Sequence, residues 1–306
     1  MQRKQSIALN NFAEAPVCVM TIKGERWDTV LHLSEHQMRL INSRFERQFY
    51  NRCREDRLIG FIDDAPNREE LELIAKKYGI ADICIFSDIN LYGIKRLLKV
   101  IVSVLYRYPR LRSRMSYLGT HSGYIGAVER LRAGDTAVLK DFGLEYICSE
   151  KMAKDLGRQL ASSVEPIEAE GGNHIATAVS AFGFFDAILF DEKDYDGYAY
   201  IKMVSLLREN ERSGFHPKGC SGPESVVYHE VGHMLDSMLS LSESEEFKSF
   251  YNRCSERDII AGLSEYAASS PTEMIAEAFA EYMCSSSPRY TAKYIGELID
   301  KKYKEL

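Results

Sequence analysis

The sequence predicts an α+β protein with a small sheet and many helices. Short apolar runs typical of strands lie at residues 17–33, 80–88, 114–120, 174–183 and 185–194. Longer segments repeat apolar residues at three- and four-residue spacing, as amphipathic helices do, and such segments dominate after residue 197. With 306 residues, the chain is long enough for one large domain or two modest ones.

Residues that favour helix starts and stops delimit several of the predicted helices. Ser34 and Asn67 are favourable N-caps, whereas Gly79 and Pro109 favour helix ends. In chain order, the predicted helices in the first two thirds of the sequence are 34–56, 68–79, 89–109, 123–134, 149–164 and 197–210.

Two stretches interrupt this series of helices and strands. Residues 165–173, EPIEAEGGN, have the composition of a linker, and residues 213–223 have that of a loop. We place the domain boundary earlier, where the first buried strand is followed by an apolar helix. The prediction is a mainly helical or mixed region of undefined role at 1–87 and a second domain at 88–306.

Charge and composition exclude several classes of partner. The formal net charge is −6 and the isoelectric point about 5.8, which gives no general case for nucleic-acid binding. No run of about 18 apolar residues exists, so no membrane span is predicted. The seven cysteines include no CxxC pair, which argues against a disulfide framework and a cysteine-based zinc site. The N-terminus does not resemble a signal peptide, so we expect cytoplasmic synthesis, with specialised export or packaging in a virion left open.

The segment 221–241 is predicted to form one helix. Ser221 and Glu224 have the spacing of a capping box, and Pro223 suits a first helical turn. Apolar residues recur along the segment and provide a surface to bury.

This helix carries the sequence VVYHEVGHMLD, which contains an H-E-x-x-H motif. His229 and His233 project from one face one turn apart, so both imidazoles can reach one zinc ion. Glu230 lies beside them and can accept a proton from a metal-activated water, and Gly232 leaves space next to the second histidine. The alternative is a structural helix that carries two histidines by coincidence.

Three further polar residues could contribute to a metal site. Asp236 lies one turn after the second histidine and can orient a histidine ligand, although a solvated helix charge explains it equally well. His174 and His216 fall in predicted loops, where exposed or structural roles are favoured over metal binding.

No histidine follows the motif, so the third zinc ligand is a carboxylate or a cysteine downstream or a residue from upstream, and residues 263–283 are the evident source. Ser270 is a candidate N-cap, and a helix is predicted after it. Glu273, Glu277 and Glu281 are spaced by four and share one face, among many apolar residues. Spacing alone ranks Glu273 and Glu277 nearly equally, and a capping box between Ser270 and Glu273 would compete with metal binding.

Two blocks of the sequence follow a pattern seen in known metallopeptidases. HEVGHMLD at 229–236 is followed by EYAASSPTEMIAEAF at 265–279. Together they resemble the gluzincins, specifically the catalytic domain of anthrax toxin lethal factor and related domains of phage head-associated proteins. Those domains have H-E-x-G-H-x-x-D, then a tyrosine, then E-x-x-A-E-A-F. FHPKGCSGPESVVYHEVGH also resembles the approach to the active-site helix in the phage-associated branch, and the resemblance covers about residues 180–285.

The resemblance implies a zincin-like domain, in which a small twisted sheet supports an active-site helix and a glutamate helix. The implied cofactor is Zn²⁺, with His229, His233 and Glu273 as its ligands.

The resemblance also implies roles for three further residues. Glu230 becomes the general base, and Tyr266 hydrogen-bonds the oxyanion or protonates the leaving amine. Glu277, one turn beyond the glutamate ligand, becomes a carboxylate that supports the ligand set.

The predicted function is zinc-dependent hydrolysis of a peptide bond in a protein or peptide substrate. Residues 185–194 are predicted to be an edge strand that binds an extended peptide as an added strand. The alternative function is a virion-associated or interaction protein that retains a zincin fold around a structural zinc. An intact Glu230 favours the enzyme, because a structural site needs no general base.

Overall fold

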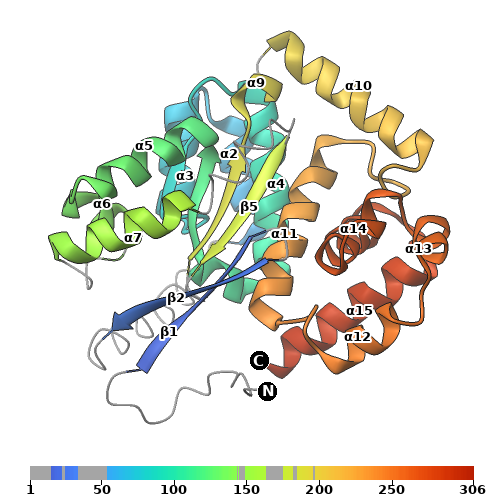
Figure 1. Cartoon of the computed structure of the whole chain (residues 1–306). Helices are drawn as coiled ribbons and strands as arrows, with labels where there is room; N and C mark the ends of the chain where they lie inside the picture. Colours follow the sequence, from blue (N-terminus) through green and yellow to red (C-terminus); the bar gives the residue numbers. More distant parts are fainter. Residues whose placement is uncertain are drawn as a thin grey trace.

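The computed structural model describes residues 54–142, 144, 149–162, 175–181, 185–195 and 197–306, and the backbone of 15–22 and 25–33. It is a mixed α+β structure in which helices surround one sheet (Figure 1). Most of the predicted helix at 34–56, the linker at 165–173 and His174 lie outside the described residues.

The sheet has six strands in the order β2-β1-β5-β6-β4-β3. Its strands are β1 (Ala15–Ile22), β2 (Glu25–Leu33), β3 (Ile83–Ile85), β4 (Met115–Thr120), β5 (Ala176–Ala181) and β6 (Phe185–Phe190). β3, β4 and β6 run parallel to one another, whereas β6–β5, β5–β1 and β1–β2 are antiparallel pairs.

The prediction of an edge strand at 185–194 is wrong. β6 pairs with β4 on one side and with β5 on the other, and all six of its residues are buried. Both rows of its backbone groups are therefore occupied, so no peptide can add to it. The strand ends at Phe190, and the acidic continuation forms the short helix α9 (Glu192–Tyr195) instead.

The sheet separates two apolar cores, and successive residues of its strands point into different ones. Leu118 and Ile188 face the larger core, whereas Tyr117 and Leu189 face the smaller one. The smaller core is closed by α5 (His121–Arg132), α6 (Thr136–Asp141) and α7 (Glu150–Ser162).

The larger core is built from helices of the first third and the last third of the chain. They are α2 (Glu55–Asp64), α3 (Arg68–Lys77), α4 (Leu91–Arg107), α10 (Gly197–Ser213), α11 (Pro223–Leu239), α12 (Glu245–Tyr251), α13 (Glu256–Gly262), α14 (Pro271–Cys284) and α15 (Tyr290–Glu305). The 3₁₀ segments η1 (Pro109–Ser113) and η3 (Tyr266–Ala268) lie between them. In Figure 1, α11 stands between the sheet and the C-terminal helices. No helix in the described part of the chain is long and apolar enough to cross a membrane.

The described part of residues 1–87 shares a sheet and a core with the rest of the chain. It contributes three strands as well as two helices, and β3 pairs with β4 across the predicted boundary. Asn67 caps α3 as predicted, by accepting a hydrogen bond from the Glu70 amide. The division at residue 87 stays a prediction.

The predicted capping box at the start of α11 is wrong. Gly222 is the N-cap residue and supplies no side chain, and α11 begins at Pro223. Glu224 forms no capping box with Ser221, and its carboxylate pairs with Arg96 of α4. An ion pair between two helices therefore replaces the local cap.

Candidate metal centre

Two helices of the larger core position the candidate ligands. α11 supplies His229 and His233, and α14 packs against it so closely that a Cβ at Gly232 would lie 2.7 Å from Ala276 Cα. Gly232 is therefore required for the approach of α14 rather than for space beside a histidine. α14 starts where the sequence predicts, because Ser270 Oγ accepts a hydrogen bond from the Glu273 amide at 3.1 Å.

His229, His233 and Glu273 form a candidate metal-binding triad. The His229 Nε2 and His233 Nε2 atoms are 3.1 Å apart, and Glu273 Oε2 lies 3.2 Å from the first and 3.4 Å from the second. Ligand atoms of a tetrahedral zinc site with bonds of about 2.0–2.1 Å lie about 3.3–3.4 Å apart. The three atoms thus have nearly the spacing of one face of a zinc tetrahedron.

The chemistry of the donors also fits zinc. Glu273 Oε2 is buried and accepts no hydrogen bond from the described residues, which leaves it available to a cation. Burial raises the pKa of Glu273, but the nearby imidazoles outweigh this effect and hold the pKa well below its usual value. The group is therefore a carboxylate, the form in which it binds metal.

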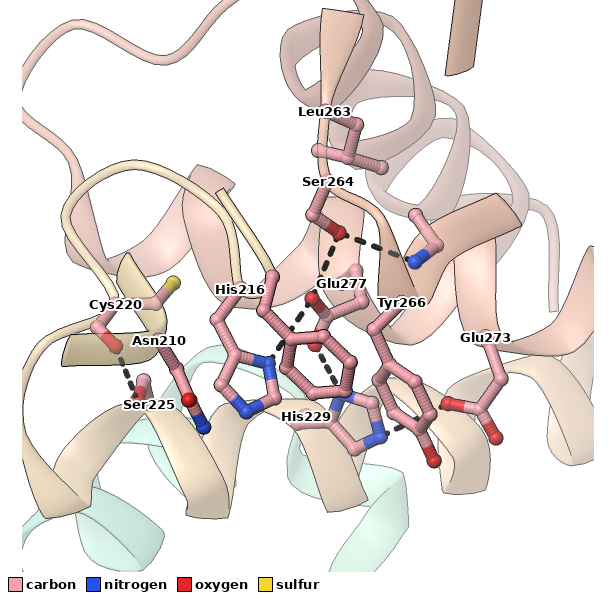
Figure 2. Close-up of polar contacts among 12 residues, drawn as sticks. Asn210, His216, Cys220, Ser225, His229, Leu263, Ser264, Tyr266, Glu273 and Glu277 are labelled. Carbon is pink, nitrogen blue, oxygen red and sulfur yellow. Dashed lines mark hydrogen bonds and ion pairs between the residues drawn. The ribbon is translucent and has the colours of Figure 1, made fainter. Parts of the chain in front are cut away.

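Glu277 lies behind the triad and orients its first histidine. The His229 Nδ1–H donates to Glu277 Oε1 at 2.8 Å, and the other ring nitrogen, Nε2, faces Glu273 of the triad (Figure 2). The second carboxylate oxygen accepts from Ser264 Oγ at 2.9 Å and from His216 Nδ1 at 3.3 Å. Two carboxylates that spacing ranked equally therefore differ in position: Glu273 belongs to the triad and Glu277 supports it.

Glu230 is buried beside the histidines and lines a cavity of about 250 Å³. Burial raises the pKa of Glu230, while the two histidines and a hydrogen bond from the Ala178 amide of β5 act in the opposite direction. The net effect is a raised pKa, which makes this carboxylate a better proton acceptor than an exposed one.

Tyr266 in η3 lies over the triad. Its ring stacks on the His229 ring, with centroids 5.8 Å apart and planes inclined by 22°. In Figure 2 the hydroxyl end of Tyr266 is directed towards the end of the site that holds His229 Nε2 and Glu273. This tyrosine also lines the cavity.

The remaining predicted residues have different outcomes. Asp236 is buried and accepts a hydrogen bond from the Ser242 amide at 2.6 Å, and no hydrogen bond to His233 is present within the described residues. Its side chain thereby holds the turn that follows α11. His216, for which an exposed or structural role was favoured over metal binding, is not part of the triad; it lines the cavity and contacts Glu277.

The cavity beside the triad combines apolar walls with a few polar groups. Its lining residues come from β5, α10, α11, α14, η3 and the loop after α10; they are Ile175, Ala176, Leu206, Leu207, Asn210, Phe215, His216, Cys220, Ser225, Val226, His229, Glu230, Tyr266, Glu277 and Ala280. Apolar walls with few polar groups are typical of sites that take a small molecule or one side chain of a larger ligand.

Comparison with known proteins identifies no relative: no family model, no curated protein and no solved structure matches this chain.

Proposed function

We propose that this protein is a zinc-dependent peptidase with a zincin-like arrangement, in which α11 is the active-site helix and α14 the glutamate helix. The observation that carries the proposal is the triad of His229, His233 and Glu273, with zinc-like spacing and a buried carboxylate oxygen that accepts no hydrogen bond from the described residues. The resemblance of the two sequence blocks to gluzincins points to the same chemistry.

Three protein ligands are the number found in catalytic zinc sites, which keep a further position for water or substrate. When bound, zinc would polarise the carbonyl of a peptide and activate a water for attack. Glu230 would take the proton of that water and pass it to the leaving nitrogen. The Tyr266 hydroxyl would donate a hydrogen bond to the developing oxyanion, an interaction worth about 3–4 kcal/mol for one such donor.

The substrate would be a protein or peptide with one side chain in the cavity. Its walls include Leu206, Leu207 and Val226, so this side chain would be apolar at least in part.

The test compares wild type with Glu230→Gln, first by zinc content and then by cleavage of a random peptide library. Glu230 is not in the triad, so the variant should bind zinc at wild-type stoichiometry and lose about 10²- to 10⁴-fold in kcat/KM. Peptidase activity that survives the substitution would refute the assigned role of Glu230. Full zinc occupancy without cleavage by the wild type would instead support a structural zinc in an interaction protein.

A further inference from the structure

The Tyr266 ring stacks with two other rings beside the candidate metal centre. Phe215 stacks on Tyr266 with centroids 5.5 Å apart and planes inclined by 24°, and Tyr266 stacks in turn on His229. The His216 ring meets the Tyr266 ring edge-on at 5.9 Å and 90°. The Tyr266 ring is therefore in contact with three rings, those of Phe215, His229 and His216.

The main chain holds the same two segments together. The Glu265 amide donates to the Gly214 carbonyl at 2.9 Å, and the Tyr266 amide donates to the Phe215 carbonyl at 3.1 Å. The loop after α10 is thus paired with the segment that carries Tyr266, although about 50 residues separate them in sequence.

Core packing does not explain this arrangement. Phe215 is 37% exposed, and His216 directs one ring nitrogen to Glu277 rather than into apolar surroundings. A partly exposed ring such as that of Phe215 contributes little buried area. Offset stacking of aromatic rings has a preferred geometry, however, and therefore restricts how the Tyr266 ring can turn.

We propose that Phe215 and His216 are positioning residues that fix the ring of Tyr266 against His229 and so set the place of its hydroxyl. The inference rests on the proposed function for its kinetic consequence, since Tyr266 acts there on the oxyanion. The placement of the ring itself is a structural property that can be measured without turnover.

The structural arm labels the protein with 3-fluorotyrosine and records ¹⁹F NMR spectra of the zinc-loaded full chain. Tyr266 is one of 18 tyrosines, so its resonance is identified by its loss in Tyr266→Phe. Phe215→Leu should move or broaden this resonance, whereas Phe215→Tyr, which keeps the stacked ring, should not. The matched control is Phe61→Leu, because Phe61 stacks on Tyr78 at the same 5.5 Å, in a part of the fold without candidate ligands.

His216→Asn provides a second variant that does not depend on Phe215. It keeps a side-chain amide to donate to Glu277 but removes the ring that meets Tyr266 edge-on. It should disturb the Tyr266 resonance, whereas His216→Phe, which keeps a ring, should disturb it less. An unmoved Tyr266 resonance in both Phe215→Leu and His216→Asn would overturn the proposal.

The kinetic arm is a double-mutant cycle. Phe215→Leu should lower kcat about 10- to 100-fold, as expected when a catalytic group is displaced by about 1 Å, while KM and zinc content stay close to wild type. In the Tyr266→Phe background the same substitution should change kcat by less than about twofold, because the hydroxyl it positions is already gone. Equal losses in both backgrounds would overturn the proposal. A wild type that cleaves no peptide would refute the proposed function. The NMR experiment would still show whether Phe215 and His216 fix the position of the Tyr266 ring.

Discussion

The substitution Glu277→Gln tests whether Glu273 and Glu277 of α14 have different roles at the candidate metal centre. Glu277 accepts three hydrogen bonds, from His229 at 2.8 Å, from Ser264 at 2.9 Å and from His216 at 3.3 Å. A glutamine has nearly the same size, but its NH₂ group cannot accept. In Glu277→Gln, the NH₂ group must take the place of one carboxylate oxygen. There it faces a hydrogen-bond donor and cannot form the original hydrogen bond.

The expected loss follows from the distance between Glu277 and the triad. The side chain contacts His229 Nδ1 and not Nε2, the atom that belongs to the triad, so the substitution should leave the three candidate ligands in place and disturb the orientation of His229. Loss of such a supporting contact costs about 10- to 100-fold in metal affinity, equivalent to about 1.4–2.7 kcal/mol. Glu273→Gln removes an anionic ligand and should weaken zinc binding at least about tenfold more than that.

Zinc affinity is measured by competition with a chromophoric chelator at neutral pH. The matched control is Glu281→Gln on the same helix, because Glu281 is 0% exposed and its carboxylate pairs with Arg289, remote from the triad. This control should lower the free energy of unfolding and leave zinc affinity within about twofold of wild type.

Two results would refute this reasoning. If Glu277→Gln weakened zinc binding as much as Glu273→Gln, the two glutamates would not have the different roles that their positions indicate. If Glu281→Gln weakened zinc binding as much as Glu277→Gln, the loss would reflect general damage to α14 rather than the contact with His229.

Two further predictions concern stability. Gly232→Ala should lower the free energy of unfolding by about 1–3 kcal/mol in urea titrations, because its Cβ would overlap Ala276; a more stable variant would contradict the close approach of α11 and α14. Asp300 accepts from Tyr108 at 2.6 Å and pairs with Arg107 at 2.7 Å; burial raises the pKa of Asp300, but these contacts outweigh it and hold the pKa below its usual value. A depressed acid pKa stabilises the fold above the unfolded pKa of about 4 and loses this effect as pH falls through the folded pKa. Asp300→Asn should therefore cost about 1–2 kcal/mol at pH 7 and much less near pH 2, and a pH-independent difference would exclude this origin.

Local sequence signals predicted the elements whose structure depends on near neighbours. Asn67 and Ser270 are N-caps as expected, because a cap needs only the backbone amides of the next turn. His229 and His233 share one face of α11 because four-residue spacing brings side chains together on any helix. The capping box at Ser221 failed for the converse reason: Glu224 found a stronger partner in Arg96, 128 residues away.

The error at 185–194 has a physical reason. An edge strand and an interior strand differ in their neighbours, and here one neighbour, β4, precedes β6 by about 65 residues. The run FDAILF is apolar except for Asp186, which is typical of a strand buried on both faces, and this signal was available in the sequence. Phe215 was missed, and the contact of His216 with Glu277 was not predicted, because their partners Tyr266 and Glu277 lie about 50–60 residues further along the chain.

By itself, the sequence determined that two histidines and a glutamate would lie together on one helix, and that a row of carboxylates would line another. Apart from the resemblance to gluzincins, the spacing could not choose between Glu273 and Glu277, because residues one turn apart on the same face are equivalent until a second helix packs against them. Tertiary packing made the choice. The close approach of α14 to α11 at Gly232 places Glu273 Oε2 beside the two Nε2 atoms and Glu277 beside the Nδ1 of His229, so the different positions of the two glutamates depend on the contact between the two helices.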